Sequence, residues 1–169
     1  NPLGKGDSVT INVIFDPWIG GPRTWYVDDD ALDGGDGSLE HPFRIIQDAV
    51  NASDDRAIIR VFNGTYNENV IINKSVSLIG NGSANTTIDA GGNGDVVKIT
   101  VDWVNMSGFW ITGSGRVGRP AIDSGIDVES NHNIISNNNC TNNYYGIYLF
   151  SSSECIIENN ACENNYLDI

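Results

Sequence analysis

The chain has 169 residues, of which 22 are acidic and 9 are lysine or arginine, so its formal net charge is −13. This excess of acid excludes the clustered basic surface that binds nucleic acid, and it disfavours an anionic membrane surface. No apolar run approaches the roughly 18 residues that a membrane-spanning helix needs. The length is that of one domain with an appended segment, and we divide it into residues 1–24 and 25–169.

Residues 1–24 are predicted to contain one strand and its linkers. Residues 8–15 alternate apolar and polar side chains, as strands do, and glycine and proline flank them. This strand lies outside the repeat pattern of residues 25–169. It is therefore either the end of a preceding domain or a strand that pairs with another chain. Because no charged-then-apolar leader is present, we expect a removed signal peptide or a longer parent chain.

Residues 25–51 are predicted to form a short strand, an acidic loop and one helix. The strand is Trp25–Val27, and the loop at 28–40 is rich in aspartate and glycine. Residues 43–51 place apolar side chains at helical spacing, which predicts an amphipathic helix. From Ala57 onward only strands and turns are expected.

Repeats in the remaining sequence predict a solenoid. Residues 133–143 recur as 155–165 at an offset of 22, and residues 97–111 match 126–140 at an offset of 29. The extra residues are assigned to an insertion at 115–124, and the alignment gives about four coils. Asparagine doublets fall between the strands, where this residue tolerates left-handed backbone angles and its amide can bond the next coil.

The three cysteines, Cys140, Cys155 and Cys162, fit no zinc-binding spacing. Cys140 and Cys162 hold equivalent positions in the repeat, so their Cα atoms are expected about 4.8 Å apart in neighbouring coils. That separation permits a disulfide bond. The alternative is an inward row of reduced, small apolar side chains, and the sequence favours it.

Several motifs together resemble a known superfamily. They are Tyr26–Asp30, Asp36–Ser38, Pro42-Phe43, Ile46–Val50, Gly64–Glu68, Val76–Gly80 and the asparagine-rich coils. They are similar to motifs of the right-handed parallel β-helix (pectin-lyase-like) superfamily, in particular its NosD-like, carbohydrate-binding and sugar-hydrolase repeats on archaeal and bacterial surfaces. The resemblance implies an all-β, right-handed parallel β-helix solenoid of about four coils, with the helix as its N-terminal cap. An extracellular or cell-surface location is expected.

One pair of carboxylates is a candidate for catalysis. Asp127 and Glu129 lie two residues apart on one predicted strand, so both face outward, with Lys98 and Tyr148 stacked beside Asp127. Two carboxylates can serve general acid and base chemistry. The pectin-degrading members' Gly-His-Gly, paired aspartates on adjacent strands and Arg-x-x-Arg are missing. The sequence therefore favours a solvated or packed face and a module that is not an enzyme.

A second candidate is a calcium site in the acidic loop. Asp29, Asp33 and Glu40 fall at positions 1, 5 and 12 of the calcium-loop pattern. Ala31 stands where position 3 needs an oxygen ligand, and no helix leads into the loop. The favoured interpretation is a solvated turn without a cofactor, with calcium as the alternative.

The NosD-like resemblance also implies copper handling, which the residues support poorly. The two histidines, His41 and His132, lie far apart in the sequence, and the single methionine, Met106, is expected to point inward. Six aromatic side chains are predicted outside the core, either as a contact surface or covered by the insertion or the N-terminal strand: Trp103, Trp110, Tyr144, Tyr145, Tyr148 and Phe150.

Two functions remain open. Seven sequons predict glycosylation of a surface protein: Asn51, Asn63, Asn73, Asn81, Asn85, Asn105 and Asn139. Residues 166–169 begin another coil, so either the chain continues or another subunit covers that end. The main hypothesis is a secreted structural module that assembles head-to-tail, through residues 8–15 or the open coil, into a filament, sheath or surface layer. The alternative is a carbohydrate-binding or polysaccharide-degrading module.

Overall fold

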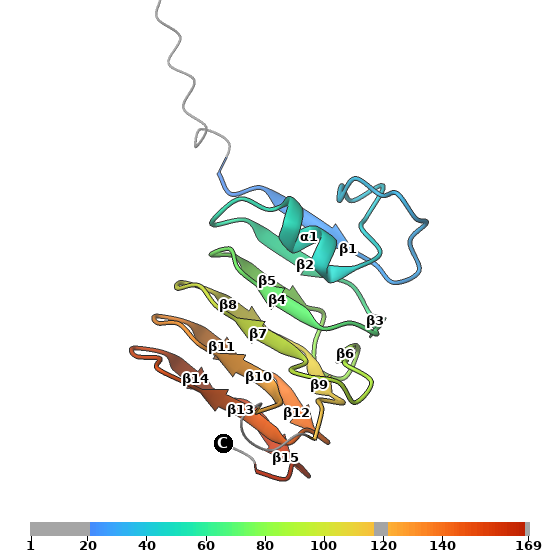
Figure 1. Cartoon of the computed structure of the whole chain (residues 1–169). Helices are drawn as coiled ribbons and strands as arrows, with labels where there is room; N and C mark the ends of the chain where they lie inside the picture. Colours follow the sequence, from blue (N-terminus) through green and yellow to red (C-terminus); the bar gives the residue numbers. More distant parts are fainter. Residues whose placement is uncertain (1–20, 117–121, 168–169) are drawn as a thin grey trace, which may run out of the picture.

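The protein is a right-handed parallel β-helix, in which the chain winds through three sheets (Figure 1). The computed structural model describes residues 21–116 and 122–167. The strand predicted at residues 8–15 lies outside these described residues. Within them, all pairings between named strands are parallel.

The strands are distributed over three sheets, which we call A, B and C. Sheet A contains β1 (Thr24–Val27), β2 (Ile58–Val61), β5 (Ser77–Gly80), β8 (Asn105–Ser107), β11 (Ile134–Ser136) and β14 (Ile156–Glu158). Sheet B contains β3 (Gly64–Tyr66), β6 (Thr86–Asp89), β9 (Trp110–Thr112), β12 (Asn139–Thr141) and β15 (Ala161–Glu163). Sheet C contains β4 (Val70–Ile72), β7 (Val97–Ile99), β10 (Ser124–Val128) and β13 (Tyr145–Leu149). The described strands make four complete three-strand coils, starting at β2, β5, β8 and β11, which confirms the predicted coil number.

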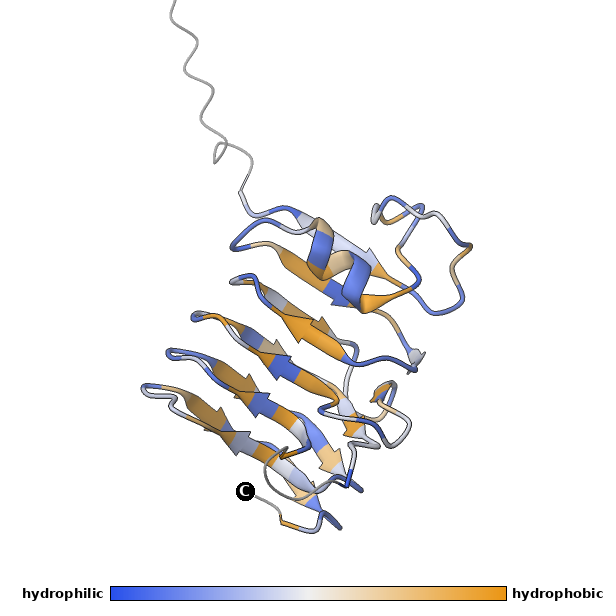
Figure 2. Cartoon of the chain, in the orientation of Figure 1, coloured by the Kyte–Doolittle hydropathy of each residue, from blue (hydrophilic) through white to orange (hydrophobic). Residues whose placement is uncertain are grey.

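The core is a stack of equivalent apolar side chains inside the coils. In sheet A, Leu78 pairs with Met106 and Met106 with Ile135, and all three side chains are fully buried. Ile111 and Cys140 pair in the same way in sheet B. Each such side chain contributes about 1.5–3 kcal/mol through burial. Apolar and polar residues accordingly alternate along the strands (Figure 2), and the predicted offset of 29 is confirmed.

The one helix in the described part of the chain, α1 (Ile46–Ala52), packs on the N-terminal end of the stack, as predicted (Figure 1). Its start was predicted three residues too early, because Phe43 is held in an extended bridge to Val27. The helix has no side-chain cap of its own. Instead, the carboxylate of Glu68, from the adjacent coil, accepts hydrogen bonds from the Ile46 and Gln47 amides at 2.8 and 2.9 Å.

Buried asparagine side chains secure the bends between strands, as the repeat predicted. The Asn138 Oδ1 atom accepts a hydrogen bond from the Phe109 amide of the preceding coil at 3.1 Å, and Asn160 does the same for the Asn138 amide at 3.0 Å. Asn143 and Asn165 repeat this arrangement at the next bend, at 3.0 Å. Gly125 leaves room for this packing, because a Cβ atom there would lie 2.7 Å from the Asn143 amide nitrogen.

Two other predictions concern the C-terminal coils. The insertion was assigned to residues 115–124, but Ser124 already belongs to β10, and residues 117–121 lie outside the described part. Cys140 and Cys162 are paired in register, as predicted, and both side chains are thiols, not a disulfide. No helix among the described residues is long and apolar enough to cross a membrane.

Replacing Asn138 by alanine should lower the free energy of unfolding by about 1–3 kcal/mol, because the buried Phe109 amide loses its acceptor. Chemical denaturation monitored by circular dichroism measures this change. The matched control is Asn67→Ala at an exposed position, which should change stability by no more than about 0.5 kcal/mol. Equal effects of the two substitutions would contradict a special role for the buried amide.

Candidate functional site

A pocket of about 310 Å³ lies over β7, β10 and β13 of sheet C. It combines acidic, basic and aromatic side chains. Its lining consists of Asp95, Lys98, Ile122, Asp123, Asp127, Glu129, Tyr148 and Phe150. We call it the sheet C pocket. It contains all three residues that the sequence proposed as candidates for catalysis.

Strand register brings the central residues of this pocket together. Lys98 on β7, Asp127 on β10 and Tyr148 on β13 are successive partners in the sheet, which confirms the predicted stacking. The Lys98 Nζ atom lies 3.0 Å from Asp127 Oδ2 and 2.7 Å from Glu129 Oε1. One lysine thus bridges two carboxylates from the neighbouring strand.

Asp127 does not lie on a solvated face, which was one of the two favoured interpretations. Its exposed fraction is 4%, because Lys98, Glu129 and Tyr148 surround it. The Oδ2 atom is satisfied by Lys98, but the buried Oδ1 atom has no hydrogen-bond partner among the described residues. Burial raises the pKa of Asp127, although the lysine opposes this effect.

A further carboxyl of the pocket, that of Asp95, did not stand out in the sequence. Burial, with the nearby charge of Asp127, raises the pKa of Asp95 to about 6, against the ordinary 3.8. Its Oδ1 atom accepts a hydrogen bond from the Ser124 amide at 2.7 Å. The carboxyls of Asp95 and Asp127 therefore interact across adjacent coils. Asp95 stands two residues before the start of β7, so a search for acids just ahead of the sheet C strands finds it.

Lys98 supplies the positive charge of the pocket and stays protonated. Burial alone would lower its pKa, but the hydrogen bonds to Glu129 and Asp127 raise the pKa of Lys98 to about 12. The pocket therefore presents a charged ammonium, a carboxylate and a carboxyl group that ionises near neutral pH. Such a set can donate and accept protons at a bound hydroxyl or leaving-group oxygen.

Aromatic rings form one wall of the pocket. Tyr148 and Phe150 stack with ring centroids 6.4 Å apart and an interplanar angle of 12°. Phe150 is 55% exposed, so its face is open to a ligand. All six aromatic side chains predicted outside the core are exposed or partly buried.

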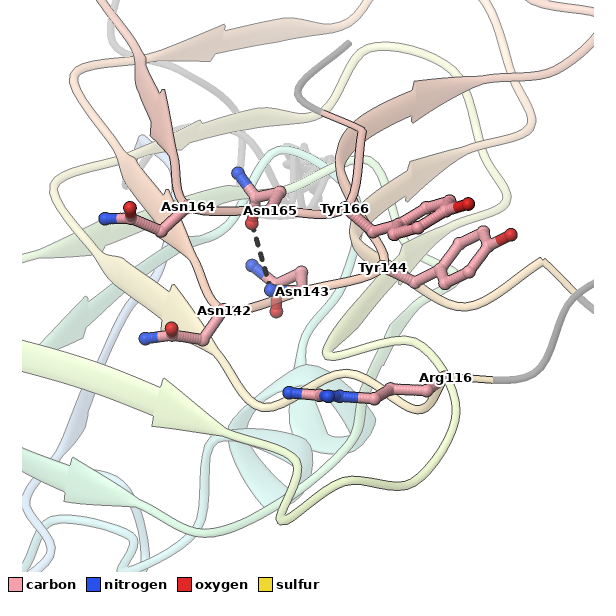
Figure 3. Close-up of a pocket in the computed structure, with 7 residues that line it drawn as sticks. All are labelled: Arg116, Asn142, Asn143, Tyr144, Asn164, Asn165 and Tyr166. Atoms are coloured by element: carbon pink, nitrogen blue, oxygen red, sulfur yellow. Dashed lines mark hydrogen bonds between the residues drawn. The ribbon is translucent and has the colours of Figure 1, made fainter.

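A second pocket, of about 410 Å³, lies at the bends before β13 and after β15 (Figure 3). Its lining residues are Arg116, Asn142, Asn143, Tyr144, Asn164, Asn165 and Tyr166. Tyr144 and Tyr166 stack at 4.9 Å, and the Asn143 amide donates to Asn165 Oδ1 (Figure 3). Sequence analysis did not single out this pocket, which we call the bend pocket. The sequence repeat could have indicated this pocket, since Tyr166 follows Tyr144 at the 22-residue offset.

The structure does not bring the predicted calcium ligands together. The carboxylates that cluster within 4.8 Å are those of Asp28, Asp29 and Asp30. Asp33 instead lies 3.2 Å from Arg44, and Glu40 is outside the cluster. Asp29 also accepts a hydrogen bond from the Thr65 amide at 2.8 Å, which gives this carboxylate a structural role.

The residues considered for copper are also apart from one another. Met106 is fully buried in the core, as predicted. His132 stacks on Trp103 at 4.3 Å, and its Nδ1 atom lies 3.1 Å from Glu154. His41 lies in the loop before α1 and lines the acidic pocket there. No copper-binding set forms from these three residues.

The seven sequons lie at accessible positions. Asn105 and Asn139 are partly buried at the starts of their strands. The exposed sequons are Asn51, Asn63, Asn73, Asn81 and Asn85. Whether any of them carries a glycan stays a prediction.

No protein-family model and no curated protein matches the sequence. Solved structures with a similar fold include two pectin methylesterases. PemA from Erwinia chrysanthemi has a TM-score of 0.55 and 14% identity, covering 74% of this chain and 45% of that one. The carrot enzyme has a TM-score of 0.58 and 19% identity, covering 89% and 48%.

A third similar structure is the GH136 lacto-N-biosidase from Eubacterium ramulus, with a TM-score of 0.55 and 15% identity. The alignment covers 80% of this chain and 30% of that one. The chain thus spans less than half the length of each of these three proteins. At these identities the similarity shows the fold, which is the pectin-lyase-like, right-handed parallel β-helix.

The Asp95 carboxyl should make stability depend on pH. Its pKa is about 6 in the folded protein and near 3.8 in the unfolded chain, so the folded state binds the proton more tightly. Stability from this group is therefore full below pH 3.8 and declines as the pH rises to about 6. Asp127 acts in the same direction.

Asp95→Asn should reduce this decline to the part that Asp127 contributes, because an amide keeps the hydrogen bond from the Ser124 amide without ionising. Thermal melts between acidic and neutral pH measure the effect, with Asp54→Asn at an exposed position as the control. Parallel pH profiles for the wild type and Asp95→Asn would show that Asp95 does not titrate with a raised pKa.

Proposed function

We propose that the protein binds a carbohydrate in the sheet C pocket. The observation that carries this proposal is the combination of a charged hydrogen-bonding network with an open aromatic wall. Lys98, Asp127 and Glu129 offer donors and acceptors for sugar hydroxyls, while Tyr148 and Phe150 offer stacking faces for the apolar side of a sugar ring. The fold supports the same proposal, since the similar structures are named as carbohydrate enzymes.

The charge of the pocket favours an uncharged sugar. Four carboxyl groups line it, from Asp95, Asp123, Asp127 and Glu129, against the single ammonium group of Lys98. Even with Asp95 protonated the pocket is negative, and it repels uronate and sulfate groups. Neutral hexoses, pentoses and N-acetyl sugars fit this electrostatic environment.

Hydrolysis is a second candidate function. The one observation that favours it is the raised pKa of Asp95. In such a reaction Asp95 gives its proton to the leaving-group oxygen as the bond from carbon to that oxygen breaks. A water oxygen bonds to the carbon, and a second carboxylate of the pocket takes the proton that the water loses. The cycle closes when that proton returns to Asp95.

The main hypothesis from the sequence, a secreted surface module that assembles into a filament, sheath or surface layer, stays a prediction. Five exposed sequons support glycosylation and an extracellular location. A sugar-binding pocket is compatible with that setting, since a surface protein meets extracellular glycans.

Binding is tested by calorimetry with neutral cello-, xylo-, manno- and chito-oligosaccharides, and with oligogalacturonates as the acidic comparison. Neutral sugars should bind, and Tyr148→Ala should weaken them about tenfold through lost stacking. Tyr26→Ala, a partly buried tyrosine on β1 outside the pocket, is the matched control. Binding of only the acidic series, or equal loss in both variants, would contradict the proposal.

Hydrolysis is tested separately on any sugar that binds. Asp95→Asn should abolish turnover by more than about a hundredfold while leaving affinity within a few-fold, because the amide keeps the site's shape but cannot give up a proton. Activity that survives in Asp95→Asn would remove this aspartate as the acid. The exposed Asp54→Asn again serves as the control.

A further inference from the structure

We propose that the bound glycan is an oligosaccharide that continues from the sheet C pocket along β13 into the bend pocket. This inference rests on the proposed function and adds the length and direction of the ligand. The glycan then crosses the solenoid along a strand instead of following the stack of coils.

A continuous strip of aromatic rings joins the two pockets. Phe150 and Tyr148 belong to the sheet C pocket, and Tyr148 contacts Tyr145 at 5.1 Å between ring centroids. Tyr145 contacts Tyr144 at 5.2 Å, and Tyr144 stacks on Tyr166 at 4.9 Å in the bend pocket. Each ring therefore lies within stacking distance of the next.

Apart from the step from Tyr144 to Tyr166 in the next coil, the strip follows one strand. In the preceding coil, the partners of Tyr145 and Tyr148 are Ser124 and Asp127, neither of which is aromatic. The next partner of Asp127 is Lys98. A strand rises about 3.3 Å per residue, so the six steps from Tyr144 to Phe150 span about 20 Å. This length accommodates several sugar rings.

The rings of the strip are not used to fill the core. Phe150 is 55% exposed, so it keeps a face open to solvent. Tyr144, Tyr145 and Tyr148 are partly buried and lie outside the core cluster. Such rings are suited to stacking on sugars.

The bend pocket adds polar groups for the far end of the chain. Arg116 is exposed and makes no ion pair with the described residues, and its guanidinium lies beside Asn142 and Asn143 (Figure 3). The exposed Asn142 and Asn164 side chains lie at the same edge (Figure 3). Guanidinium and amide groups donate to and accept from sugar oxygens, next to the Tyr144–Tyr166 stack.

Chain-length dependence tests this path. Calorimetry with cello-, xylo-, manno- and chito-oligosaccharides should show that the hexasaccharide of the bound series binds at least about tenfold more tightly than its disaccharide. The double variant Tyr144→Ala, Tyr166→Ala should lose that gain and keep the disaccharide affinity. Tyr148→Ala should weaken both lengths alike.

Arg116→Gln gives a second, conservative test on an exposed side chain, and it should weaken the hexasaccharide several-fold but not the disaccharide. Thermal melts of each variant check that the fold is retained. If disaccharide and hexasaccharide bind the wild type equally, or if both tests leave the gain intact, the path along β13 is wrong while the pocket proposal stands. If no oligosaccharide binds, the proposed function itself fails.

Discussion

The structure depends on keeping every coil in register with the next, and buried asparagine amides enforce that register where the strands end. Strand hydrogen bonds hold coils together only along the sheets, so the bends would otherwise leave backbone amides unsatisfied. Asn138 and Asn143 accept from the amides of Phe109 and Ser114 in the preceding coil. Asn160 and Asn165 repeat both bonds one coil later. A shift by one residue would break these bonds and turn the apolar stack outward.

This register also creates the chemistry of the sheet C pocket. Residues that are 29 positions apart, Lys98 and Asp127, become direct neighbours because their strands pair without offset. The same alignment buries Asp127, so its carboxylate depends on the ion pair with Lys98. Burial is the largest cause of the raised pKa values of Asp95 and Asp127. This burial results from the stacking of the coils.

The sequence predicted the elements that repeat and missed those that depend on distant contacts. The apolar alternation and the 22-residue offset were sufficient for the β-helix, its coil number and the Cys140–Cys162 pairing. The start of α1 was wrong because Phe43 is held in an extended bridge to Val27, a contact that helical spacing does not reveal. Of the two interpretations of Asp127, a solvated face or a packed one, its burial fits the packed one, because alternation shows that a side chain faces outward but not what covers it. Asp95 was missed because its raised pKa arises first from its own burial, which the sequence does not show.

Coil length varies without disturbing the stack. The connection from β12 to β13 needs only residues 142–144, whereas that from β9 to β10 spans residues 113–123, yet β10 pairs in register with strands on both sides. Added residues at this corner therefore leave the strand register of β10 unchanged. Evolution can lengthen, shorten or exchange such a corner one coil at a time, so new recognition surfaces can be acquired beside an unchanged scaffold. Protein engineers can use the same corner to graft foreign peptides.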